Sequence, residues 1–173
     1  MPFQLSEAIT TLERTSDVLN HLLKNMPAAW LTSNEGENTF SPYDVVGHLI
    51  HGEEADWIPR ATLILTKGES QPFEPFDRFA MYTKFKSKSI DELLAMFASA
   101  REQSLATLKS WNLTEEQLNL KGTHPALGTV TLKQLLATWV VHDLNHISQI
   151  TRVISKQYTG EVGAWKEYLS ILK

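Results

Sequence analysis

The sequence has no cysteine among its 173 residues. Disulfide bonds, zinc sites built from thiolates and a nucleophilic cysteine are therefore excluded for this chain. Any sulfur that takes part in chemistry here has to arrive with another molecule. The absence of cysteine also fits a cytoplasmic protein, and this is the location that we expect.

Long apolar runs and clusters of like charge are missing as well. A stretch of about 18 apolar residues, which would predict a membrane-spanning helix, does not occur in the sequence. The first residues, MPFQLSEAIT, lack the basic and apolar regions of a signal peptide. Because the net charge is −4 and no basic block exceeds a few residues, nucleic acids and anionic membranes are poor candidates as partners.

Apolar residues recur with helical spacing in four segments of the chain. The helices predicted from this spacing span about residues 4–26, 42–66, 90–111 and 132–155. The last three begin with capping signals, which are Ser41 before Pro42, Ser89 with Glu92, and Thr131 with Gln134.

Strand signals are weak, so we expect an all-α protein with a single domain over residues 1–173. Four long helices in a chain of this size predict a four-helix bundle. The links 67–88 and 112–130 are longer than neighbouring antiparallel helices need. The first link could return along the bundle, which predicts the topology up-down-down-up. The tail 163–173 is expected to form a short C-terminal helix or an arm that packs on the bundle.

The segment WVVHDLNHISQI, residues 139–150, carries two histidines in an apolar run. On a helical wheel, His142 and His146 lie at about −60° and −20° from Trp139, with Ile150 at about +20°. Both imidazoles therefore lie on the buried stripe, one helical turn apart. Two imidazoles at this spacing can share one metal ion.

A third ligand has to come from another helix, and His48 is the best candidate. It lies within the inward-facing set Val45, Leu49, Gly52 and Ala55, whereas His51, the rival, lies further from the centre of that set. Three imidazoles leave a coordination position open, which is typical of catalytic metal sites. Zinc and nickel are the first expectations, followed by iron and cobalt. The alternative is that these histidines are hydrogen-bonded core residues without a metal.

Three further side chains are candidates for the surroundings of the site. Gln149 follows the second histidine of the pair by one turn and could orient its imidazole, as metal-bound histidines commonly require. Asp44 precedes the histidine of the second helix by one turn, although a capping role suits it better. Trp139 is expected in the core, although it could line a pocket. Asp143 is more typical of a surface or helix-packing residue, and Glu53 is expected to be solvated. No residue is assigned a catalytic role.

Two stretches resemble a known family. FSPYDVVGHLIHGEEADW (40–57) and WVVHDLNHISQITRV (139–153) are similar to the motifs of the DinB-like (DinB/YfiT) superfamily of metal-dependent four-helix-bundle proteins. The resemblance spans roughly residues 40–155.

This resemblance implies an up-down-down-up bundle and a histidine triad, His48, His142 and His146, that holds a divalent transition metal. It implies a metalloenzyme with a small-molecule substrate, most simply a transferase that uses a low-molecular-weight thiol. A metal-dependent hydrolase and a non-catalytic, metal- or ligand-binding dimeric bundle are the alternatives. A homodimer is also implied.

Overall fold

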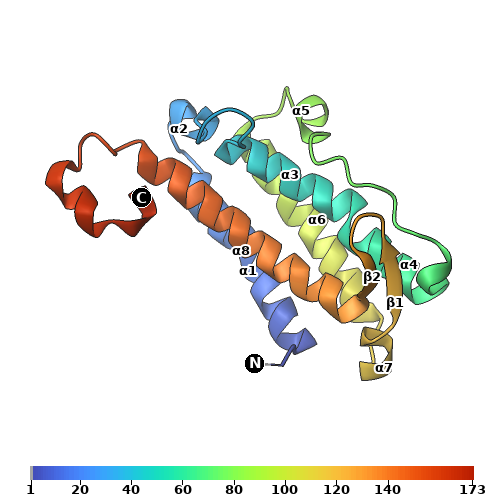
Figure 1. The fold of residues 1–173 in the computed structure, drawn as a ribbon. Coiled ribbons are helices and arrows are strands. Elements are labelled where there is room, and N and C mark those ends of the chain that lie inside the picture. The colour runs from blue at the N-terminus through green and yellow to red at the C-terminus, as the bar shows by residue number, and fades with distance from the viewer. Residues whose placement is uncertain (1) are drawn as a thin grey trace.

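The computed structural model describes residues 2–173, and helices form most of it (Figure 1). The four long segments are α1 (Leu5–Leu23), α3 continued by α4 (Pro42–Ala55 and Trp57–Lys67), α6 (Ile90–Ser110) and α8 (Leu132–Lys156). The shorter elements are α2 (Ala28–Thr32), η1 (Gly68–Ser70), α5 (Met81–Lys84), α7 (Glu115–Leu118), β1 (Lys121–His124), β2 (Gly128–Thr131), η2 (Gly163–Tyr168) and η3 (Ser170–Leu172). The prediction of a four-helix bundle is confirmed.

Helices α1 and α8 run towards one end of the bundle, and α3, α4 and α6 run towards the other (Figure 1). The parallel course of α3 and α6 is visible in one contact: the Tyr43 hydroxyl lies 2.7 Å from the carbonyl oxygens of both Phe85 and Lys88. This contact joins the first turn of α3 to the residues just before α6. The intervening link therefore returns along the bundle instead of turning directly into the next helix.

The predicted helix caps are present. Ser41, Ser89 and Thr131 each accept a hydrogen bond from the backbone N–H three residues later, and the side chain at that position accepts one from the cap. These reciprocal bonds satisfy N–H groups that have no partner within the helix. Local chemistry thus sets where α3, α6 and α8 begin.

Residues 42–66 were expected to form one continuous helix. The structure instead divides this segment at Asp56 into α3 and α4. Pro59 has no backbone N–H with which to bond the Ala55 carbonyl, and its ring disfavours an unbroken helix there. The break places Asp56 where it forms an ion pair with Arg60, with 2.8 Å between Oδ1 and Nε.

A short β-hairpin departs from the all-α prediction. Strands β1 and β2 pair antiparallel, from Lys121 opposite Thr131 to His124 opposite Gly128. The hairpin packs closely on α4: a Cβ atom added to Gly122 would lie 2.7 Å from Cγ1 of Ile64. The sequence signal was weak, because the strands are only four residues long and the short alternation Thr129, Val130, Thr131 runs directly into the cap of α8.

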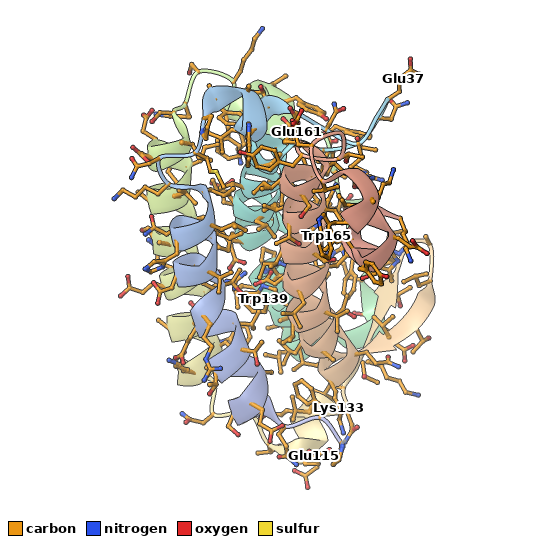
Figure 2. The ribbon with its side chains drawn as sticks, turned by 90° about the vertical axis from the view of Figure 1, so that its left-hand side faces the viewer. Glu37, Glu115, Lys133, Trp139, Glu161 and Trp165 are labelled. Carbon is orange, nitrogen blue, oxygen red and sulfur yellow. The ribbon has the colours of Figure 1, made fainter. Side chains whose placement is uncertain are left out.

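The C-terminal segment forms 3₁₀ turns, η2 and η3, where a short helix was expected. Leu172 is buried, whereas Trp165 is 73% exposed and lies on the outside of the molecule (Figure 2). Within residues 2–173, no helix combines the length and apolar character needed to cross a membrane.

The bundle interior consists of two apolar clusters with a polar layer between them. One cluster contains Leu19, Ile50, Phe97 and Ile150, and the other contains Leu12, Trp57, Leu105 and Trp139. Figure 2 shows Trp139 in the middle of the bundle, between α1 and α8. Between the two clusters, every long helix contributes buried polar side chains, among them Thr15 of α1, Glu53 of α3, Arg101 of α6 and Asp143 of α8.

Arg101 joins the members of this polar layer. Its Nε and Nη2 donate to Oε1 of Glu53 at 3.1 and 2.7 Å, and its Nη1 donates to Oδ2 of Asp143 at 2.6 Å. The same Nη1 also donates to the carbonyl of Leu12, and Thr15 donates to Asp143. Burial opposes the charged form of Arg101, but the two carboxylates hold its pKa above the ordinary value. Arg101 therefore stays a cation in a site that excludes water.

Replacement of Arg101 by methionine is expected to lower the free energy of unfolding by about 3–5 kcal/mol, since two carboxylates would remain buried without their cation. Urea denaturation followed by circular dichroism measures the change. The control is the triple variant Glu53→Gln, Arg101→Met, Asp143→Asn, in which no charge is left unpaired. It should be more stable than Arg101→Met alone, and a triple variant of equal or lower stability would contradict the explanation by charge.

Candidate metal centre

Three imidazoles meet next to the polar layer, between α3 and α8. Nε2 of His142 lies 3.2 Å from Nε2 of His48 and 3.2 Å from Nε2 of His146. Each histidine offers a ring nitrogen within 4.8 Å of the other two. His48 and His146 are buried, and the side chain of His142 is 23% exposed, so the cluster is closed towards the core and open on one side.

The spacing of the three nitrogens fits a shared metal ion. Zinc–nitrogen bonds of about 2.0–2.1 Å in tetrahedral geometry place neighbouring nitrogens about 3.3 Å apart. The two separations of 3.2 Å agree with this value. Nδ1 of His146 lies 2.9 Å from Oε1 of Gln149 and can donate to it, which leaves the lone pair of Nε2 directed into the cluster. A lone pair on Nε2 is what a metal requires.

The electrostatics of the cluster favour neutral rings. Burial, followed by the neighbouring imidazoles, lowers the pKa of His48 to about 3. Burial and then His142 lower the pKa of His146 to about 4, although the hydrogen bond to Gln149 acts in the opposite direction. Near pH 7 both rings are therefore unprotonated, as metal ligands must be.

Aromatic side chains fix the ring positions. The rings of Phe40 and Phe76 lie 5.3 and 5.7 Å from that of His48. Trp57 meets His142 nearly edge-on, with 5.1 Å between the ring centres. The carboxylate of Asp143 lies 4.0 Å from Nδ1 of His142 and is itself held by the Arg101 network. The site is thus supported by the same layer that joins the four helices.

The other predicted site residues lie in different places. Gln149 contacts His146, in keeping with the predicted orienting role. Asp44 caps α3 instead, because its Oδ2 accepts hydrogen bonds from the backbone N–H and the hydroxyl of Ser41. Trp139 stacks on Trp57 and donates its indole N–H to Glu53, so it lies behind the imidazoles, in the core.

The histidine considered as a rival ligand, His51, is not part of the cluster. Its ring stacks on Phe76, with ring centres 4.8 Å apart. His124 lies in the hairpin, where its Nδ1 accepts hydrogen bonds from the backbone N–H groups of Ala126 and Leu127. His124 therefore shapes the turn.

The expectation that Glu53 is solvated was wrong, since Glu53 is 5% exposed and paired with Arg101. Asp143, expected to be a surface or helix-packing residue, is 1% exposed and is also an ion-pair partner of Arg101. The signal that could have revealed both is an arginine on an apolar helix stripe, one turn after Phe97, because such a cation needs carboxylate partners.

A cleft of about 480 Å³ opens beside the imidazoles. It is bounded by α4, the hairpin and α8, and its walls include Trp57, Phe73 and Leu135. His48 and His142 form part of its lining. We call it the apolar cleft, and its size is typical of small-molecule sites.

A second cleft, of about 370 Å³, reaches the same three imidazoles. Its lining is more polar and includes Arg78, Asn145 and Gln149. The Arg78 guanidinium lies over the rings of Phe40 and Phe79, at 5.2 and 5.1 Å. We call this the polar cleft. His48 and His142 line both clefts, so two separate molecules could approach them.

Comparison with known proteins places the chain among helical bundles. The sequence-family model of the DinB superfamily matches residues 11–150. No curated protein matches the chain.

Three solved structures share the fold. YfiT from Bacillus subtilis, described as a probable metal-dependent hydrolase with an unusual four-helix bundle topology, superposes with a TM-score of 0.77 at 23% identity, over 90% of each chain. The four-helix bundle protein TT2238 has a TM-score of 0.56 at 20% identity, over 86% of this chain and 98% of its own. A DinB-like protein from B. subtilis has a TM-score of 0.54 at 18% identity, over 87% and 92%.

Acid should destabilise the metal-free protein. The pKa values of His48 and His146 in the folded state lie below the ordinary value of 6.5, so the unfolded chain binds protons first as the pH falls. The stability that these neutral rings contribute is complete above about pH 6.5 and is lost towards pH 4 and below. Ring nitrogen NMR should report neutral imidazoles for both residues at pH 5.5. Protonated rings at that pH in the folded protein would contradict the assignment.

Proposed function

Since this chain belongs to the DinB superfamily, we propose that His48, His142 and His146 hold a divalent transition metal and that the protein is a metal-dependent enzyme. The observation that carries the proposal is the convergence of three Nε2 atoms, with neighbouring separations of 3.2 Å that suit one metal ion. The buried, neutral rings and the bond from His146 to Gln149 support it.

Zinc and nickel are the proposed metals, with iron and cobalt as alternatives, because three imidazoles suit all four. When bound, such a metal supplies Lewis acidity that keeps a thiol or a water molecule deprotonated near neutral pH. The chain's own contribution is to hold neutral rings in place, to orient His146 through Gln149 and to shield the ion on the core side.

The reaction we propose is group transfer that uses a low-molecular-weight thiol. Two clefts reach the same imidazoles, and a transfer reaction needs places for two organic molecules. The chain has no cysteine, so the sulfur has to come with the cosubstrate. Arg78 and Asn145, in the polar cleft, could bind the polar or anionic part of a small thiol.

Hydrolysis is the second candidate. It is favoured by the likeness to YfiT, which is described as a probable metal-dependent hydrolase. In that reaction water takes the place of the thiol, and the polar cleft would serve as a solvent path. A non-catalytic binding protein is the third candidate, and it requires that bound metal confer no turnover.

Metal content tests the site. We expect about one equivalent of transition metal per chain in untagged protein purified without chelator. His48→Ala, His142→Ala and His146→Ala should each weaken metal binding by more than the roughly 10- to 100-fold expected for the loss of an outer partner. Elemental analysis and calorimetric titration measure both quantities.

The matched controls are His51→Ala and His124→Ala, which remove histidines outside the cluster and should leave the metal affinity unchanged. Circular dichroism establishes that each variant is folded. Wild-type protein that takes up no zinc, nickel, iron or cobalt would refute the proposal. The non-catalytic alternative, in which the histidines are core residues, predicts instead that His142→Leu is tolerated or stabilising.

Replacement of Gln149 should weaken metal binding although all three proposed ligands remain. Gln149→Leu keeps the size of the side chain but removes the oxygen that orients His146, and it should reduce the metal affinity about 10- to 100-fold. Asn145→Leu, one turn earlier in the polar cleft, is the matched control and should change the affinity much less. Equal effects of the two substitutions would argue against an orienting role.

Turnover assays separate the two reactions. Metal-loaded protein supplied with a small thiol and an electrophilic cosubstrate should consume both if it is a transferase. Ester or amide cleavage that needs metal but no thiol would instead establish hydrolysis.

A further inference from the structure

The apolar cleft is large enough for a molecule of drug size and is built mainly from hydrophobic side chains. Trp57 and Phe73, 4% and 3% exposed, and Leu135, 8% exposed, form its deep walls. Such rigid, largely buried groups preform a pocket, because little side-chain freedom is lost when a ligand enters.

The hairpin closes one side of this cleft and is held there firmly. The backbone N–H of Phe73 donates to the carbonyl of Thr123 at 2.9 Å, which ties the link after α4 to β1. His124 accepts the N–H groups of Ala126 and Leu127, so the hairpin turn has a defined shape. The wall is therefore part of the fold.

Leu127, at the tip of the hairpin, lines the cleft but is 74% exposed. A leucine so exposed contributes little to the core and keeps most of its unfavourable contact with water. A bound apolar molecule would cover part of this surface and gain the corresponding free energy. The tip thus offers contact area that the folded chain alone does not use.

Charge on the cleft lining argues against an ionic ligand. Among the described residues that line it, Asp56 and Arg60 are the formally charged ones, and they form an ion pair at 2.8 Å. Arg60 is occupied further, since it donates to the Glu74 carbonyl and its guanidinium lies over Phe73. A charged ligand would lose its hydration here without finding an unpaired counter-charge.

We propose that the apolar cleft binds an uncharged, largely apolar small molecule. Its placement beside His48 and His142 makes this molecule the substrate that the metal-dependent reaction transforms, and this second step rests on the function proposed above. The polar cleft, with Arg78, is left for the cosubstrate. Binding itself depends on the cleft walls and does not need the metal.

Two fluorescent probes test the ligand class. N-phenyl-1-naphthylamine is uncharged, and 8-anilinonaphthalene-1-sulfonate has the same aromatic skeleton with an added sulfonate. We expect the uncharged probe to bind the full-length protein saturably, at about one site per chain, with and without metal. The sulfonate should bind about tenfold more weakly or less, because its charge would be buried without a partner.

Substitutions locate the probe. Leu127→Asp should weaken binding of N-phenyl-1-naphthylamine about fivefold or more, by loss of apolar contact and by added charge. Thr138→Trp, at an exposed cleft position on α8, should fill the space and reduce binding in the same way. Leu144→Asp is the matched control, because Leu144 is an exposed leucine of α8 that lines neither cleft.

The proposal is overturned if the sulfonate binds as tightly as the uncharged probe, if the uncharged probe does not bind, or if Leu144→Asp weakens it as much as Leu127→Asp. The metal-free arm separates this result from that of the metal site. If the protein binds the uncharged probe but takes up no metal, the proposed ligand class stands and the proposed metal-dependent reaction is refuted. If it takes up metal but does not bind the probe, the metal site stands and the proposed ligand class is refuted.

Discussion

A single buried cation, the guanidinium of Arg101, connects all four long segments of this bundle. It extends from α6 to Glu53 on α3, to Asp143 on α8 and to the Leu12 carbonyl on α1. Two apolar clusters lie on either side of it. A helix displaced by one turn would bring a leucine or an aromatic ring against this charge, so the polar layer sets the relative heights of the helices. The apolar clusters thus stabilise the bundle, and the polar layer between them fixes one alignment of its helices.

The candidate metal centre depends on this alignment. Its three histidines come from two helices, α3 and α8, and their Nε2 atoms meet because Glu53 and Asp143, a few residues away, are held by the same arginine. The three rings are therefore arranged by the bundle, in contrast to small zinc domains whose fold requires the metal. A site preformed in this way pays little ordering entropy on metal binding and can discriminate between metals by geometry and availability.

Local features of the chain were predictable, and contacts between distant residues were much less so. The caps at Ser41, Ser89 and Thr131 involve groups three residues apart, and the spacing of His142 and His146 follows from helical periodicity. Glu53 and Asp143 pair with Arg101 across 48 and 42 residues, which periodicity cannot reveal. The contact of His48 with His142 spans 94 residues, and it was expected from the inward-facing set of the second helix together with the family resemblance.

Other differences have equally physical origins. The break at Asp56 follows from Pro59, whose missing N–H outweighs the apolar pattern of residues 42–66. The hairpin escaped prediction because its strands are only four residues long and are stabilised by packing on α4. Residues of both features form walls of the apolar cleft. The cleft is therefore shaped by the two features that the sequence did not predict.

The hairpin and the bundle differ in how well they tolerate substitutions. The bundle contains the three histidines and the buried ion pairs, where most substitutions would destabilise the fold. The tip, Pro125–Leu127, is exposed and projects from β1 and β2, yet it lines the apolar cleft. Mutations there can alter the cleft without disturbing the three histidines or the alignment of the helices. Exchange of these three surface residues would change which molecules fit the cleft while the bundle stays as it is.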